Sequence, residues 1–214
     1  AGRVTAGKCY RLYMEPFYMK EMPPQTQPEI LRTNLTGFIL TLKALGVDNI
    51  LAFDLLDVPS VDAIAHGLES LYALGAIDDS THLTKLGNDL AAFPTDPRVS
   101  RMLLEAVQEK CAWEVLGVAA ALQVRDLLVP PRGRRRAQAQ VDYETAVADV
   151  ADPSGDHVTY ANCLAEMEDH QWSEQECRDR FMNYRALKHA LEVRRQLGGV
   201  LRNFGPISAI GFVG

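Results

Sequence analysis

The chain has 214 residues, 47% of them hydrophobic, and a formal net charge of −6. This suits one sizeable globular domain or two small ones, and the negative charge argues against nucleic-acid binding through a global basic field. No apolar run approaches the roughly 20 residues that cross a bilayer, and no signal peptide is visible, so we expect no membrane partner.

The first 94 residues predict a short terminal segment followed by a small mixed domain. Within residues 1–22, Lys8 to Leu12 alternates like a strand, and Pro23-Pro24 ends it. A helix with one apolar stripe then runs to Gly46, a natural left-handed stop. The stripe consists of Leu31, Leu35, Phe38, Leu42 and Leu45.

A second helix starts near Ser60 and ends at Gly75. Residues 76–84 then predict a short hairpin, and a third small helix passes through Leu86 and Leu90. We expect four residues of the second helix to point inward: Val61, Ile64, Leu68 and Leu71. Helix, helix, hairpin and helix in this order predict a winged-helix domain.

From Asp96 onward the chain predicts a helical bundle. Val115 to Leu122 is apolar nearly all round, which indicates a helix at the centre of the bundle. Residues 130–155 have the composition of the least ordered part, and a helix begins after Gly155-Asp156, with Asp156 as its cap. The last long helix runs from about Glu174 to Leu201. The predicted fold class is therefore mainly α.

Four cysteines lie too far apart for a Cys-x-x-Cys motif, and we expect buried free thiols in a reducing compartment. They are Cys9, Cys111, Cys163 and Cys177. The five histidines show no metal-ligand spacing, so no metal site is expected. No nucleophile–base pair and no paired carboxylates rise above background.

Several short motifs follow one another in a fixed order along the chain. They are Pro28 to Gly46, Leu71-Tyr-Ala-Leu-Gly-Ala-Ile77, Leu83-Thr-Lys-Leu-Gly87, Phe93-Pro-Thr-Asp-Pro97, Gly155-Asp-His-Val-Thr159 and Tyr184-Arg-Ala-Leu-Lys188 with Val193-Arg194 and Gln196-Leu197. Together they resemble the C-terminal half of a DEAH-box ATP-dependent RNA helicase. The chain departs from the family at Met167 and Glu176, where tryptophan is usual, and at Arg180, where asparagine is usual.

The resemblance implies three parts: residues 1–22 as the last strand segment of a RecA-like motor domain, 23–94 as a winged helix, and 95–214 as a helical ratchet domain. It implies ATP and Mg as cofactors of a parent protein that is an ATP-dependent RNA helicase. This chain has no Gly-x-x-x-x-Gly-Lys-Ser/Thr loop and no Asp-Glu-Ala-His sequence. We therefore expect an excised piece that holds no cofactor and hydrolyses no ATP alone, from an intracellular protein, with the nucleus favoured over the cytoplasm.

Two groups of residues are candidates for functional sites. By the resemblance, Arg3 would reach the terminal phosphate of the nucleotide in the parent. Four basic residues of the final helix follow steps of seven, three and seven and would share one side of it: Arg178, Arg185, Lys188 and Arg195. The resemblance places this helix beneath single-stranded RNA, whereas the alternative is a solvated face with local ion pairs. Glu192 shares the face and weakens its field.

Other basic residues have open interpretations. Arg132 to Arg136 could bind phosphates, act in nuclear import or form a solvated loop. Arg32 and Asn34 could lock the winged helix to a motor domain or serve only in local capping and ion pairing.

Two other functions stay open from the sequence. One is a protein-docking module for a glycine-rich (G-patch type) activator, bound in an apolar groove of the winged helix. The other is a winged-helix DNA-binding regulator, which the acidic helix at 60–74 suits poorly because it offers Asp62, His66, Glu69 and Ser70 to base edges.

Overall fold

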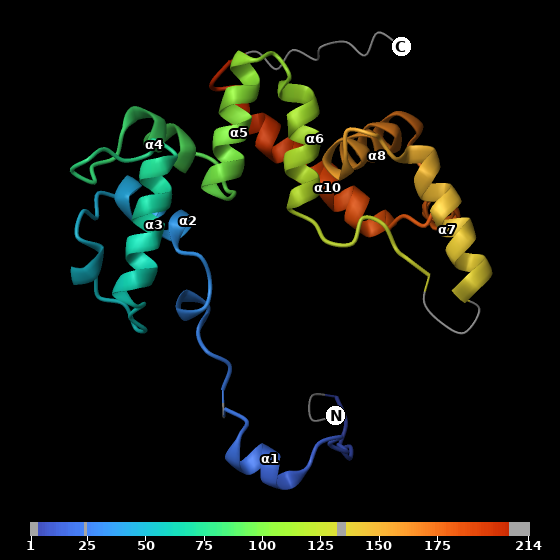
Figure 1. Ribbon diagram of the computed structural model, residues 1–214, viewed down its shortest axis with the longest axis horizontal. Coiled ribbons are helices and arrows are strands. Elements are labelled where there is room, and N and C mark those ends of the chain that lie inside the picture. The colour runs from blue at the N-terminus through green and yellow to red at the C-terminus, as the bar shows by residue number, and fades with distance from the viewer. Residues whose placement is uncertain (1–3, 24, 132–135, 206–214) are drawn as a thin grey trace.

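The computed structural model describes residues 4–23, 25–131 and 136–205, and for residues 136–139 it describes only the backbone. Within these ranges the regular elements are helices, together with two isolated antiparallel bridges (Figure 1). The fold class is therefore mainly α, as predicted. The helices named below are α1 Glu15–Lys20, α2 Thr36–Ala44, α3 Val61–Ala73, α4 Lys85–Ala91, α5 Pro97–Gln108, α6 Ala112–Leu122, α7 Arg136–Val150, α8 Asp156–His170, α9 Glu174–Asp179 and α10 Tyr184–Leu201.

The predicted strand from Lys8 to Leu12 is wrong. These residues are irregular and exposed, and the nearest element is the short helix α1. A strand needs a neighbour to satisfy its backbone groups, and no described segment pairs with this one. In Figure 1 this part (dark blue) projects away from the other helices.

The first predicted helix is divided in two. Residues Glu29–Leu31 form a 3-10 turn, and α2 begins only at Thr36, whose backbone N–H donates to Asn34 Oδ1 at 2.7 Å. The stripe is correct at Leu35, Phe38 and Leu42, but Leu31 and Leu45 are exposed. Gly46 has the positive φ of 85° that the predicted stop requires.

The second predicted helix is α3, and its ends agree with the sequence. Ser60 caps it by accepting a hydrogen bond from the Ala63 N–H, and Gly75 follows its C-terminus with a φ of 72°. Ile64 and Leu71 are buried as expected and Leu68 partly so. Val61, the first residue of the helix, is 65% exposed, contrary to the prediction.

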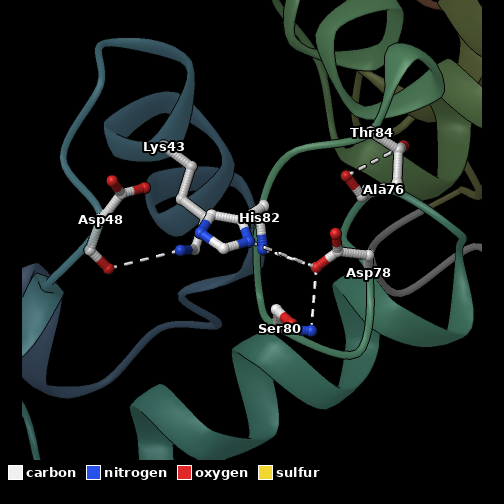
Figure 2. Close-up of polar contacts among 7 residues, drawn as sticks. All are labelled: Lys43, Asp48, Ala76, Asp78, Ser80, His82 and Thr84. Atoms are coloured by element: carbon white, nitrogen blue, oxygen red, sulfur yellow. Dashed lines mark hydrogen bonds and ion pairs between the residues drawn. The ribbon is translucent and has the colours of Figure 1, made fainter.

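The predicted hairpin is a small wing closed by one antiparallel bridge, Ile77 to Leu83. Figure 2 shows the Asp78 carboxylate inside the turn, where one oxygen accepts from the backbone N–H groups of Ser80 and His82, both at 2.9 Å. Thr84 leads directly into α4 and caps it by accepting from the Gly87 N–H at 3.0 Å. The carboxylate therefore replaces the hydrogen bonds that a longer ladder would supply.

Gly87 explains the Leu-Thr-Lys-Leu-Gly sequence physically. A Cβ atom at this position would lie 2.1 Å from the backbone oxygen of Ala76. Only glycine therefore lets α4 pack this closely against the wing. This approach completes the winged-helix unit, in which α2 packs against α3 and α4.

Helix α6 is the centre of the bundle, as its apolar sequence predicts. It packs against α5, α8 and α10, and Leu116 and Ala119 on it are buried. Helix α5 precedes it and begins at Pro97 with Asp96 as the cap, accepting from the Arg98 N–H at 2.8 Å. In Figure 1 α5 and α6 stand side by side, with α10 crossing behind them.

The helix predicted to start at Gly155-Asp156 is α8 and is correct within one residue, but two local predictions beside it are wrong. Residues 136–150 form the helix α7, whose apolar residues are spread around the axis and give no apolar stripe for the pattern to detect. The N-cap of α8 is Gly155, which has a φ of 123°, and Asp156 is the first helical residue and makes no capping hydrogen bond. Asp156 still places a negative charge in the first turn, where the helix dipole favours it.

The buried side chains form two cores. The first core joins the winged helix to α5, α6 and the C-terminal half of α10; its members include Leu35, Ile39, Leu71, Leu90, Leu103, Leu116, Leu197 and Leu201. The second core lies among α6, α8, α9 and the N-terminal half of α10; its members include Ala120, Ala121, Cys163, Leu164, Met167, Trp172, Cys177, Met182, Leu187 and Ala190. Helices α6 and α10 therefore contribute to both cores.

The cysteine prediction is correct for two residues. Cys163 and Cys177 are buried free thiols in the second core, and burial raises the pKa of Cys163 to about 11. Cys9 is exposed because it lies in the projecting N-terminal segment, and Cys111 is only partly buried. None of the described helices is both long and apolar enough to cross a bilayer.

Candidate nucleic-acid interface

The last predicted helix is two helices, α9 and α10, separated by Arg180 to Asn183. Ser173 begins α9 with a capping box: its hydroxyl accepts from the Glu176 N–H, and the Glu176 carboxylate accepts from the Ser173 N–H at 2.7 Å. Phe181 then turns the chain with a left-handed φ of 55°. Asn183 caps α10 by accepting from the Ala186 N–H at 3.2 Å.

Helix α10 has one buried and one basic side. The buried side contains Leu187, Ala190, Leu197 and Leu201 and faces both cores. On the other side Arg185, Lys188 and Arg195 are all exposed. Their steps of three and seven residues place them within about 80° of one another around the helix axis. The structure thus brings together three of the four predicted basic residues.

The guanidinium groups of Arg185 and Arg195 make no ion pair within the described residues. Lys188 Nζ lies 5.3 Å from the centre of the Tyr184 ring, a cation–π contact. Glu192 shares this side, as predicted, and its carboxylate lies 4.0 Å from Nδ1 of His189. The side therefore carries three full positive charges against one negative charge.

Arg178 is not on this face, because the chain breaks between α9 and α10. Its guanidinium lies 3.4 Å from the Glu174 carboxylate, an exposed pair on α9. The prediction of one continuous helix face is wrong for this residue. The turn at Phe181 nevertheless keeps it close to α10, since Arg178 and Arg185 line the same hollow.

Arg194 is a residue that the sequence reasoning missed. It is only 6% exposed, its guanidinium lies 3.7 Å from the centre of the Trp113 ring, and it donates to Glu168 at 3.0 Å. Burial lowers the pKa of Arg194, and the carboxylates of Glu168, Asp169 and Glu114 oppose this. Arg194 therefore ties α10 to α6 and α8. The motif that contains Val193 and Arg194 was the available signal in the sequence.

The residues near the N-terminus do not suit a nucleotide site of their own. Arg3 lies outside the described residues. Gly2, Gly7 and Lys8 have the spacing of a phosphate loop, but Cys9 stands where that loop needs a hydroxyl for Mg²⁺. Residues 7–9 are exposed and irregular, and α1 begins only at Glu15 rather than directly after the lysine.

The remaining basic candidates contribute little to a site. Residues 132–135 and the side chain of Arg136 lie outside the described residues. Arg32 Nε donates to the Gln27 backbone oxygen at 3.3 Å, and Asn34 Oδ1 accepts from the N–H of Thr36, the first residue of α2. These contacts favour the local interpretation for Arg32 and Asn34.

Comparison with protein families agrees with the arrangement of the helices. Residues 67–95 match the winged-helix model of the helicase-associated (HA2) domain, and residues 96–160 match its ratchet-like model. The first match contains most of α3, the wing and α4, and the second contains α5, α6, α7 and the start of α8. The chain therefore carries the helicase-associated winged-helix and ratchet-like domains, as in DEAH-box helicases.

Proposed function

We propose that the chain is the accessory C-terminal region of an ATP-dependent RNA helicase and that α10 holds single-stranded RNA. The observation that carries this is the basic side of α10, where Arg185, Lys188 and Arg195 are exposed together. Guanidinium and ammonium groups are the side chains that contact phosphate most effectively. Such contacts position a strand without reading its sequence.

The two cores supply the mechanical part of the proposal. Because the opposite side of α10 is buried in both cores, the basic side cannot turn without unpacking the bundle. The first core also includes the winged helix, which would act as a rigid pivot between the bundle and the motor domains. ATP and Mg, bound in those motor domains of the parent, would supply the energy. The bundle would resist backward sliding of the strand.

Fluorescence anisotropy with a labelled strand of about 12 uridines tests the RNA contact. We expect weak binding that falls between about 50 and 200 mM salt, because bound phosphates release counterions. Changing Arg185 and Lys188 together to alanine removes two phosphate contacts. The slope of log affinity against log salt should then fall by about 1.4, since each single-strand contact contributes about 0.7.

A matched control removes the same charge elsewhere. Lys85 and Arg98 are exposed basic residues of α4 and α5, outside α10, and their double alanine variant has the same net charge. This control should retain the affinity and the salt slope of the natural chain. Equal titrations for the two double variants would contradict the proposed contact.

The isolated chain should show no ATP turnover above a blank, with or without RNA, because it lacks the phosphate loop. A malachite-green phosphate assay measures this directly, and reproducible turnover by the pure chain would contradict the accessory role. The proposal places the parent inside the cell, with the nucleus favoured, where such a helicase meets RNA.

A second candidate function is docking of a glycine-rich activator on the winged helix. Apolar side chains of residues 51–61 are well exposed, with Leu56 at 104%, Val58 at 65% and Leu51 at 57%. Exposed apolar groups gathered in one short segment mark an interaction surface. Calorimetry with a glycine-rich peptide tests it, and Leu56→Asp should abolish the heat of binding. An unchanged titration would exclude this segment.

A duplex-DNA regulator has little support. On α3 the exposed His66 ring lies 3.1 Å from the Glu69 carboxylate, and Asp62 lies one turn away. A face with two carboxylates repels the DNA backbone and offers no guanidinium to guanine.

A further inference from the structure

A hollow of about 720 Å³ lies between the chain after α6 and the junction of α9 with α10. Its volume is within the range of about 300–1,000 Å³ that small-molecule sites occupy. One wall contains Asp126 and residues 128–131, including Pro130 and Pro131, and the other contains Phe181 and Tyr184. Arg178 and Arg185 also line the hollow.

Backbone hydrogen bonds hold the two walls together. The Val129 N–H donates to the Phe181 oxygen at 2.7 Å, and the Asn183 N–H donates to the Leu127 oxygen at 2.9 Å. An antiparallel bridge joins Leu128 to Met182 between them. Because these bonds fix both walls, the hollow exists before any ligand arrives.

Phe181 is held in an unusual conformation to form this wall. Its φ of 55° is rare for a bulky residue, and its ring meets the Tyr143 ring edge-on with 5.6 Å between ring centres. The edge contact leaves the ring part-exposed and lining the hollow. An aromatic ring presented in this way is a stacking platform for a planar ligand.

The charges of the hollow limit the class of ligand. Arg178 and Arg185 are balanced by Glu174 and Asp126, so the four groups sum to zero. The Arg178–Glu174 pair is exposed on both partners and separated by 3.4 Å, so a phosphate can compete for the guanidinium. A neutral, apolar-walled hollow suits one base with one phosphate. It does not suit a polyanion such as a nucleoside triphosphate.

We infer that this hollow receives one unstacked nucleotide of the RNA strand, its base against Phe181 and its phosphate against Arg178 and Arg185. The inference rests on the proposed function, because Arg185 belongs both to the hollow and to the basic side of α10. A strand that contacts Arg195 and then Lys188 along α10 next meets Arg185, which lines the hollow. The bundle thus holds the strand by a base as well as by phosphates.

The test compares two labelled strands of equal charge, about 12 uridines and the same ribose-phosphate strand without bases. The ratio of their affinities for the full chain measures what the bases contribute. Stacking of one base on an aromatic ring contributes on the order of tenfold in affinity. We expect a ratio of about ten for the natural chain and a ratio near one for Phe181→Gly.

Phe181→Gly removes the ring while suiting the positive φ, and Phe181→Asn is a second variant whose residue tolerates that φ. Phe53→Ala is the control, because Phe53 is an exposed phenylalanine of the winged-helix segment, outside the hollow. It should keep the natural ratio. Photocrosslinking of a strand containing 5-iodouridine should label the peptide that contains Phe181.

Different results would overturn this inference and the proposed function. If Lys188→Ala with Arg195→Ala weakens both strands, but both Phe181 variants keep the natural ratio, the hollow holds no base and the inference is overturned. If neither strand binds the natural chain, or that double variant binds both strands equally well, the RNA contact itself is wrong and the inference falls with it.

Discussion

The two cores of this chain differ in composition and in what they hold together. The first is built almost wholly from leucine, isoleucine and alanine and runs without interruption from the winged helix into the bundle. The second is rich in sulfur and aromatic groups, among them Cys163, Met167, Trp172 and Cys177. Leucine and isoleucine pack in few rotamers, whereas methionine and cysteine adapt to irregular spaces.

The boundary between the two cores does not coincide with the proposed boundary between the two domains. The winged helix and the first two helices of the bundle share one core, so the division between cores falls inside the bundle rather than at residue 95. The boundary between 94 and 95 stays a proposal about domains. Helices α6 and α10 pass through both cores. The position of the basic side of α10 therefore depends on the packing of both cores.

The largest expected effect is the loss of a buried leucine, made once in each core so that the two cores can be compared. Leu71→Ala in the first core and Leu187→Ala in the second each remove a fully buried leucine and should lower the free energy of unfolding by about 2–5 kcal/mol. Only Leu187→Ala should speed the labelling of Cys163 and Cys177, because these thiols lie in its core. Urea unfolding and mass spectrometry of labelled peptides measure the two effects. Equal labelling in both variants would mean that the cores open as one unit.

The second prediction concerns the wing, at the edge of the first core. In Gly87→Ala the new Cβ meets the Ala76 backbone oxygen, which cannot rotate away as a side chain could. We expect a loss of about 3 kcal/mol, the upper end for overpacking. Gly199→Ala is the control, since a Cβ there meets nothing within 4 Å and α10 should become slightly more stable. Equal melting temperatures for the two variants would contradict the close approach.

Much of the first core could be predicted from the sequence because its signals are local. Ser60, Gly46 and Gly75 mark helix ends through their own backbone preferences, and the apolar run from Val115 to Leu122 needs no knowledge of its neighbours. The predicted strand at Lys8 to Leu12 failed for the opposite reason. A strand is stable only beside another strand, and its sequence does not contain that partner.

The second core and the candidate site depend on contacts that periodicity does not reveal. Phe181 and Met182 continue an apolar pattern across the break between α9 and α10, so the spacing of Arg178 to Arg185 gives the wrong face. Asn183, a good N-cap, was the one local signal of the break. The burial of Arg194 depends on Trp113 in a distant part of the chain. Helix α7 mixes apolar and polar residues evenly around its axis, so its sequence gave no helical stripe.

The third prediction concerns the part of α10 where the two cores meet, here called the seam. Val193 in this part contacts both cores. Arg194→Met keeps the apolar stem but removes the charge that lies on Trp113 and pairs with Glu168. Glu168 is half-exposed and can be rehydrated, so we expect a loss of about 2 kcal/mol rather than the larger cost of a fully buried pair. Arg195→Met, at the exposed neighbouring position, should change stability by less than about 0.5 kcal/mol. Similar urea midpoints for both variants would show that the seam does not depend on this charge.

The smallest expected effect concerns the N-terminal cap of α9, at the edge of the second core. Ser173→Ala removes the capping box of α9 and should cost about 1 kcal/mol at neutral pH. The backbone N–H of Ser173, followed by its hydroxyl, lowers the pKa of Glu176. A carboxyl with a lowered pKa in the folded state stabilises above its unfolded pKa, and this stabilisation disappears as pH falls through the folded pKa.

The hydroxyl contributes to that lowered pKa, so the natural chain should lose more stability on acidification than Ser173→Ala does, and the gap between them should narrow at acid pH. Urea unfolding at neutral and acid pH measures the gap. Glu174→Gln is the control, because Glu174 is a first-turn carboxylate outside the capping box. A gap of constant size across this range would show that the Ser173 hydroxyl does not act through Glu176. In that case α9 would be held by Cys177 in the second core rather than by its cap, and the hollow beside it would depend on the core alone.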